Sequence, residues 1–196
     1  MKPSSLLNDL LLLNVSFDIH QLSPFLCWQV IDESLGGRNL MRQVGRHAGS
    51  VHLEKDDRVH VCVTAFSGAD GNAPAEDFGG FTIKNCTLQS VPRLRERDTF
   101  YSPSPFQYGQ SVDGGTAIPI GPFKVVDHGK DEKLNAFYER QVSDGSVLVD
   151  KEMGIWEMSL VLVVEIKPKA TAVGSHKRVF RFDPEAEVGT GTSKNL

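Results

Sequence analysis

The chain has 196 residues, a net charge of −4 and a hydrophobic fraction of 40%. We expect one domain, residues 1–196, because a chain of this length buries roughly 70% of its unfolded surface without a metal or disulfide. An acidic balance without a long basic block argues against nucleic acid as a partner, and the absence of 18 consecutive apolar residues argues against a membrane span.

Three cysteines are scattered along the sequence, at Cys27, Cys62 and Cys86. We interpret them as three buried, reduced thiols, with one disulfide plus one free thiol as the alternative. The apolar run at residues 10–13 is too short for a signal peptide, and no small-residue cleavage site follows it. We therefore expect a cytoplasmic protein.

The first part of the chain predicts two strands and a loop. Apolar residues alternate with polar ones over residues 11–19, which predicts a half-buried strand, although a helix over residues 5–13 is an alternative. Residues 25–31 predict a second strand, with Trp28 anchored in the core. Residues 32–49 are rich in Gly and Arg, show no period and predict a loop.

Residues 51–66 predict a β-hairpin around a three-residue loop at 55–57. In this register Leu53 faces Val59, so that apolar residues meet apolar partners across the two strands. A two-residue loop would set Leu53 against a histidine and spoil this match.

The same register places His52 opposite His60, with Cys62 two residues further along the same face. Imidazole and thiolate ligands suit zinc or copper. We favour a solvent-facing histidine pair instead, and predict no metal site and no other cofactor. Oxygen-bearing side chains in the loop 67–80 are a weaker calcium candidate that we interpret as ordinary surface: Asp70, Asn72, Glu76 and Asp77.

The middle of the chain predicts one strand, at residues 81–91, and then a long segment, 102–121, with little regular structure. Long loops of this kind are often functional. The aromatic residues Tyr101, Phe106 and Tyr108 lie at its start. They are candidates to stack on a sugar or to contact a partner, and the alternative is that they fold back over the end of the domain.

Residues 123–127 predict a short strand. Residues 134–142 fit either a helix or a strand, and we favour the strand because the Asp-Gly pair in the turn 143–145 is a strong hairpin signal leading into residues 147–149. Residues 177–182 predict the final strand. The two ends, 1–8 and 186–196, are expected to be flexible.

Residues 155–166 predict the central strand of a sheet, because every second residue is apolar and forms one unbroken face. The opposite face carries Val161 and Val163 between two glutamates. If a second copy of the chain covers these valines, the protein is a homo-oligomer with both residues at its interface. The segment 102–121 folding across the sheet is the alternative. The apolar face consists of Trp156, Met158, Leu160, Leu162, Val164 and Ile166.

Eight or nine strands, many turns and no βαβ unit predict an all-β fold, an antiparallel β-sandwich with Greek-key or jelly-roll connections. The sequence contains no nucleophile elbow, phosphate-binding loop, zinc-protease motif or C-x-x-C pair. We therefore predict no catalytic residues and no enzymatic activity.

Two segments resemble bacterial inclusion-body proteins of the PixA/AidA kind. R-V-F-R-F-D-P-E at residues 178–185 is similar to the final strand of those proteins, and L-E-K-D-D-R-V-H-V at 53–61 is similar to their middle strand pair. The resemblance implies a β-sandwich without known catalytic activity, cytoplasmic accumulation, and a part in host interaction or quorum-regulated physiology. We predict a non-catalytic protein that self-associates or binds a partner, with a small-ligand or carbohydrate-binding module as the alternative.

Overall fold

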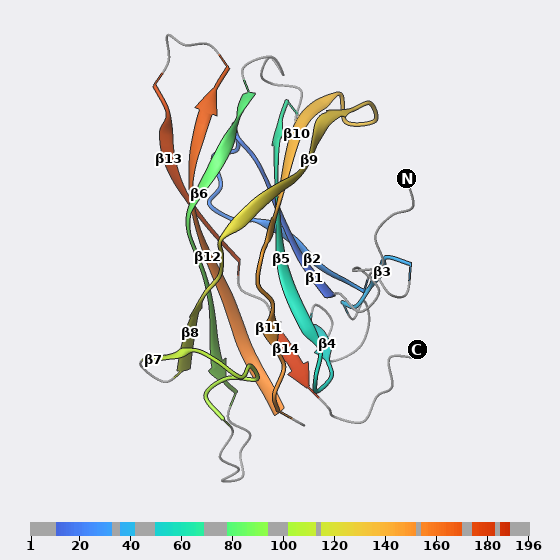
Figure 1. Cartoon of the computed structure of the whole chain (residues 1–196), viewed down its shortest axis with the longest axis vertical. Helices are drawn as coiled ribbons and strands as arrows, with labels where there is room; N and C mark the ends of the chain where they lie inside the picture. The colour runs from blue at the N-terminus through green and yellow to red at the C-terminus, as the bar shows by residue number, and fades with distance from the viewer. Residues whose placement is uncertain are drawn as a thin grey trace.

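The described residues form fourteen β-strands in two sheets, in a computed structural model of the protein. The two sheets pack face to face (Figure 1), and the described part of the chain contains no helix. The all-β sandwich predicted from the sequence is confirmed. The structure describes residues 11–32, 36–41, 50–68, 78–93, 102–112, 115–151, 154–169, 174–182 and, for the backbone alone, 185–188.

Sheet A has the strand order β3-β2-β1-β5-β10-β9, with β11 also beside β5. Its neighbouring strands are antiparallel except for the parallel pair β1 and β5. Its strands are β1 (Leu11–Asp18), β2 (Cys27–Asp32), β3 (Arg38–Asn39), β5 (Arg58–Ser67), β9 (Phe123–Asp131), β10 (Ala136–Ser143) and β11 (Val147–Leu148).

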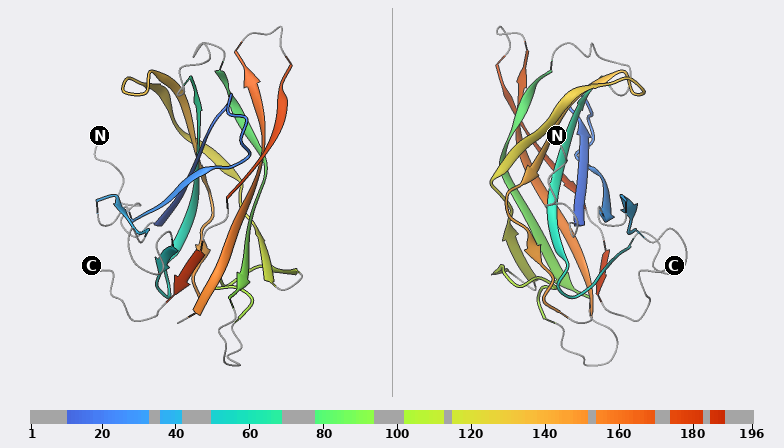
Figure 2. Two further views of the ribbon diagram at one scale, coloured as in Figure 1. Left: turned by 180° about the vertical axis from the view of Figure 1, so that it is seen from behind. Right: turned by 45° about the vertical axis from the view of Figure 1, so that its right-hand side comes forward.

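Sheet B has the strand order β4-β14-β12-β6-β8-β7, with β13 also beside β12. It too contains one parallel pair, β4 and β14. Figure 2 shows this sheet facing sheet A from two further sides. Its strands are β4 (Ser50–Leu53), β6 (Phe78–Pro92), β7 (Gln110–Val112), β8 (Gly115–Pro119), β12 (Gly154–Pro168), β13 (His176–Phe182) and β14 (Glu185–Val188).

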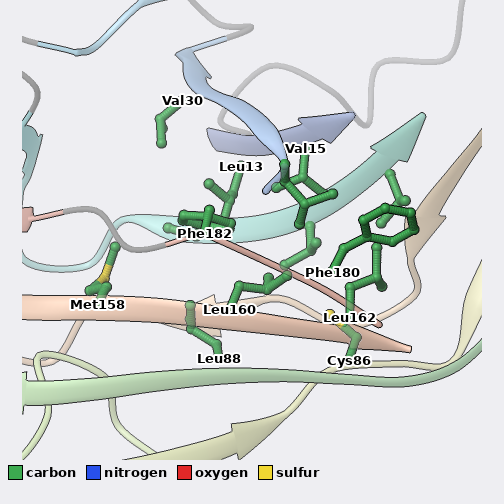
Figure 3. Close-up of a cluster of buried hydrophobic side chains, with 14 of the residues drawn as sticks. Leu13, Val15, Val30, Cys86, Leu88, Met158, Leu160, Leu162, Phe180 and Phe182 are labelled. Atoms are coloured by element: carbon green, nitrogen blue, oxygen red, sulfur yellow. The ribbon is translucent and has the colours of Figure 1, made fainter. Parts of the chain in front are cut away.

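The central strand predicted at residues 155–166 is β12, which pairs with β6, β13 and β14. Its predicted apolar face is buried against sheet A, because alternate side chains of a strand lie on one face. Figure 3 shows Leu160 and Leu162 of this strand packed with Leu13 and Val15 of β1. This face is therefore the core of the sandwich, as the sequence pattern indicated.

Aromatic rings join the two sheets at one side of the core. The ring of Phe17 on β1 stacks on Phe180 of β13 at 4.4 Å between centroids, and meets the edge of Phe81 at 5.7 Å. Trp28, half-buried on β2, stacks on Phe182 at 5.2 Å. Trp28 therefore packs against the core from a half-buried position. The strand predicted at residues 177–182 is β13, and it is not the final strand, because β14 follows it.

The predicted hairpin at residues 51–66 is wrong. Both strands exist, but β4 belongs to sheet B and β5 to sheet A, so the turn between them crosses from one sheet to the other. The apolar partners of Val59 and Val61 are Leu11 and Leu13 on β1. The match of apolar residues between 51–53 and 59–61 did not decide the partner of β5, because β1 offers β5 the same apolar match.

The turn at residues 143–145 also has a different role from the one predicted. The strand at 134–142 is confirmed as β10, but β11 does not fold back on it. Both β10 and β11 pair antiparallel with β5, end to end along its ten residues. The hydroxyl of Ser143 donates a 2.8 Å hydrogen bond to the carbonyl of Gly145 within this turn. The chain therefore leaves β5 after β10 and pairs with the same strand again at β11.

Three predicted loops or tails contain short strands. The segment 102–121 includes β7 and β8, the loop 32–49 includes β3, and the tail expected to be flexible from residue 186 includes most of β14. These strands are two to five residues long, too short for an alternation to show in the sequence. The alternative helix at residues 5–13 and the flexible N-terminal residues 1–8 lie wholly or largely outside the described residues.

The three cysteines are free thiols. Cys62 and Cys86 are buried, as predicted. Cys27 is exposed, which corrects the prediction that all three are buried. The reason is its place on β2, where it lies on the face opposite the buried Val30.

Candidate functional site

A groove of about 790 Å³ lies on the outer face of sheet A. Strand β1 shows why two faces exist: Leu11, Leu13 and Val15 are buried in the core, and the alternate residues point the other way. Most of the lining comes from outward residues of β2, β1, β5 and β10 and from Val126 of β9, and the core-facing residues Val15 and Trp28 also border the groove. Five strands from three separate parts of the sequence therefore build one site.

Strand register arranges the groove residues in rows across the sheet. Neighbouring strands lie about 4.8 Å apart, so a row of four residues spans roughly 15 Å. The first row is Cys27, Ser16, Thr64 and Arg140, and the second is Gln29, Asn14, Cys62 and Val142.

Small side chains form the floor of the groove. Thr64 and Cys62 on β5 are only 7% and 1% exposed, and Ser16 and Asn14 lie beside them on β1. Bulkier side chains, such as Phe66, also belong to the lining. The hollow follows from this difference in side-chain size across one sheet face.

The groove combines hydrogen-bonding groups with apolar walls. The amides of Asn14 and Gln29 and the hydroxyls of Ser16 and Thr64 can each donate and accept hydrogen bonds. Arg140 adds a guanidinium. The apolar surface comes from aliphatic and aromatic side chains: Leu12, Ile31, Phe66, Val126 and Val142. This mixture suits a small molecule with both a polar and an apolar part.

Two thiols belong to the groove, Cys27 and Cys62. They lie on β2 and β5, which are separated by β1, so their Cα atoms are roughly 10 Å apart. A disulfide needs Cα atoms within about 7 Å, and these two cannot form one without moving the strands. The exposed Cys27 is the accessible thiol of the site.

Asp127 on β9 lies outside the lining of the groove, beside its Arg140 end. Asp127 is the cross-strand neighbour of Arg140, and its Oδ2 accepts a 2.9 Å hydrogen bond from the hydroxyl of Tyr138. This hydrogen bond raises the pKa of Tyr138, because it stabilises the protonated phenol beside a carboxylate.

The metal-ligand arrangement considered for His52, His60 and Cys62 is contradicted. His52 is on β4 in sheet B and His60 on β5 in sheet A, so the two imidazoles are not cross-strand neighbours. The favoured interpretation, a solvent-facing histidine pair, is also wrong, because His52 is buried. His60 Nδ1 lies 3.1 Å from the carbonyl oxygen of Ser143. In the described part of the chain, no three His, Cys, Asp or Glu side chains are grouped to hold a metal ion. The calcium candidate at residues 70–77 lies outside the described residues.

The three aromatic candidates are not gathered into one site. Phe106 is buried and forms a β-bridge with Val149, so it folds back onto the domain as the alternative interpretation held. Tyr108 is 72% exposed at the edge of a smaller hollow of about 220 Å³. Tyr101 lies outside the described residues.

The predicted interface residues Val161 and Val163 lie on the outer face of sheet B, where both are half-buried. Val179, across from Val163 on β13, is 58% exposed and extends this apolar surface. The alternative prediction was that the segment 102–121 folds across the sheet and covers these two valines. Its strands β7 and β8 instead extend the sheet beyond β6.

Comparisons with known proteins do not bear on the groove. No family model matches the chain, and neither a curated protein nor a solved structure matches it. Among the described residues, no helix is both long and apolar enough to span a membrane.

Sequence reasoning missed the groove, although one signal was present. Asn14 and Ser16 alternate with the buried residues of β1, and this identifies a polar outward face. The partners of that face come from β2, β5 and β10, and the pairing of β1 with β5 bridges more than 40 residues of chain. No local pattern reports such a pairing.

Proposed function

We propose that this protein is a small-molecule-binding β-sandwich and that the groove on sheet A is its binding site. The observation that carries the proposal is the groove itself, whose volume of about 790 Å³ lies within the range of roughly 300–1,000 Å³ typical of ligand sites. Its rows of amides and hydroxyls supply directional contacts, and the apolar walls supply burial. A small-ligand-binding module was the alternative function predicted from the sequence.

The test is a fragment screen followed by amide chemical-shift mapping. A library of small neutral and charged fragments is titrated into the ¹⁵N-labelled protein. We expect shifts concentrated in β1, β2, β5 and β10. Gln29→Trp fills the groove from an exposed position and should abolish these shifts. Gln110→Trp, at an exposed position on β7, is the matched control and should leave them unchanged. Fragments that bind only elsewhere would contradict the proposal.

A second candidate function is self-association through the outer face of sheet B. The observation that favours it is Val179, which is more than half exposed beside Val163. Together with Val161, these side chains form an apolar strip that a second copy would remove from water. Such association would fit the inclusion-body proteins that the chain resembles.

A further inference from the structure

Among the described residues that line the groove, Arg140 alone carries a formal charge. Its side chain is exposed on β10, and the guanidinium offers five N–H donors in a fixed planar arrangement. No aspartate or glutamate belongs to this lining. The charge of the groove is therefore positive at one end and neutral elsewhere.

The nearest candidate partner of Arg140 is already engaged. Asp127 lies opposite Arg140 in the β9–β10 register, but its carboxylate accepts the hydrogen bond from the hydroxyl of Tyr138. Within the described part of the chain, Arg140 makes no ion pair with Asp127 or with any other acid. Its donors remain open toward the groove.

The residues around Arg140 favour an anion that carries an apolar body. Thr64 is its neighbour in the same row, about 4.8 Å away across the strands, and its hydroxyl can donate to the same anion. Val142 and Val126 supply apolar surface nearby. A carboxylate fits the guanidinium with two parallel hydrogen bonds, and an attached hydrocarbon body would lie against the valines.

Charge balance favours a single negative charge. Lys124, opposite Val142 in the β9–β10 register, does not line the groove and is paired with Asp144 at 2.7 Å. A dianionic phosphate would leave one charge without compensation, whereas a monocarboxylate is matched by Arg140. We propose that the groove binds a small organic monocarboxylate with its carboxylate on Arg140. This inference rests on the proposed ligand-binding function.

The experiment uses matched pairs of acids and amides. Benzoate, cyclohexanecarboxylate and hexanoate, each with its primary amide, are titrated into the ¹⁵N-labelled protein at low ionic strength, and Kd is taken from the groove amide shifts. Arg140→Gln removes the charge from the groove. Lys130→Gln removes a charge from an exposed position on β9 that does not line the groove, and is the matched control.

We expect the acids to bind the wild type and the Lys130→Gln variant at least tenfold more tightly than the amides do, because charge-assisted hydrogen bonds are stronger than neutral ones. Arg140→Gln should remove that preference and leave the amide affinities within twofold. If amides bind the groove as tightly as acids, the carboxylate inference is overturned while the groove remains a ligand site. If neither acids, amides nor library fragments shift the groove amides, both proposals are overturned.

Discussion

At the scale of single residues, burial distinguishes the three thiols. Cys27 is exposed in the groove, whereas Cys62 and Cys86 are buried, and burial raises the pKa of Cys86 to about 12. Since the thiolate is the reactive form, we expect one thiol per chain to react with Ellman's reagent in the folded protein and three after denaturation. Cys27→Ser should reduce the native count to zero. Rapid reaction of a second thiol in the folded protein would contradict the burial of Cys62 and Cys86.

Glu165 on β12 gives a residue-level prediction for pH. Its hydrogen bonds from Lys84 and Ser175 favour the ionised carboxylate and lower the pKa from 4.5 to about 2. The folded state therefore holds this proton less tightly than the unfolded state. The stabilisation is complete above about pH 4.5 and is lost as the pH falls through 2.

We expect Glu165→Gln to lower the urea midpoint at pH 7 and to match the wild type near pH 2. The measurement is urea unfolding followed by circular dichroism at both pH values. Glu132→Gln, at an exposed position in the β9–β10 turn, is the control and should change neither midpoint. An equal loss at both pH values would mean that the carboxylate charge is not the cause.

At the scale of elements, a substitution on β12 tests the packing of the core. Leu162 is completely buried at the centre of its inward face. Leu162→Ala removes core contacts and leaves a cavity, so we expect a loss of about 2–5 kcal/mol in the free energy of unfolding. Val161→Ala, one residue away on the half-buried outer face, should cost clearly less. A loss under about 1 kcal/mol for Leu162→Ala would place the core elsewhere.

The same scale shows what the sequence could predict. The alternation in β1 and β12 identified both strands and the face that each one buries, because a period of two is a local property. The pairing of β4 with β14 and of β5 with β1 was not predictable in this way, since each joins distant segments. The groove depends on the second of these pairings. The sequence indicated the outward groove residues of β1, but it did not indicate which residues of β2, β5 and β10 lie beside them.

At the scale of the whole molecule, the apolar strip on sheet B predicts self-association. Val163→Asp places a charge between Val161 and Val179, and desolvating that charge would disfavour a contact between copies. We expect the wild type to sediment as a species larger than the 21.6 kDa monomer and the variant to shift toward the monomer. Ser111→Asp, at an exposed position on β7, is the control and should leave the sedimentation unchanged. A wild type that remains monomeric at high concentration would contradict the second candidate function.

The place of β14 has a consequence for synthesis on the ribosome. This strand lies between β12 and β4, so its residues, 185–188, are what connect β4 to the rest of sheet B. Val51 and Leu53 of β4 leave the exit tunnel more than 130 residues before their partners on β14. During that interval sheet A can assemble its parallel β1–β5 pair, but sheet B lacks a strand. Completion of sheet B must therefore wait until residues 185–188 have been synthesised, and until then the apolar strand β4 has no β14 partner in that sheet.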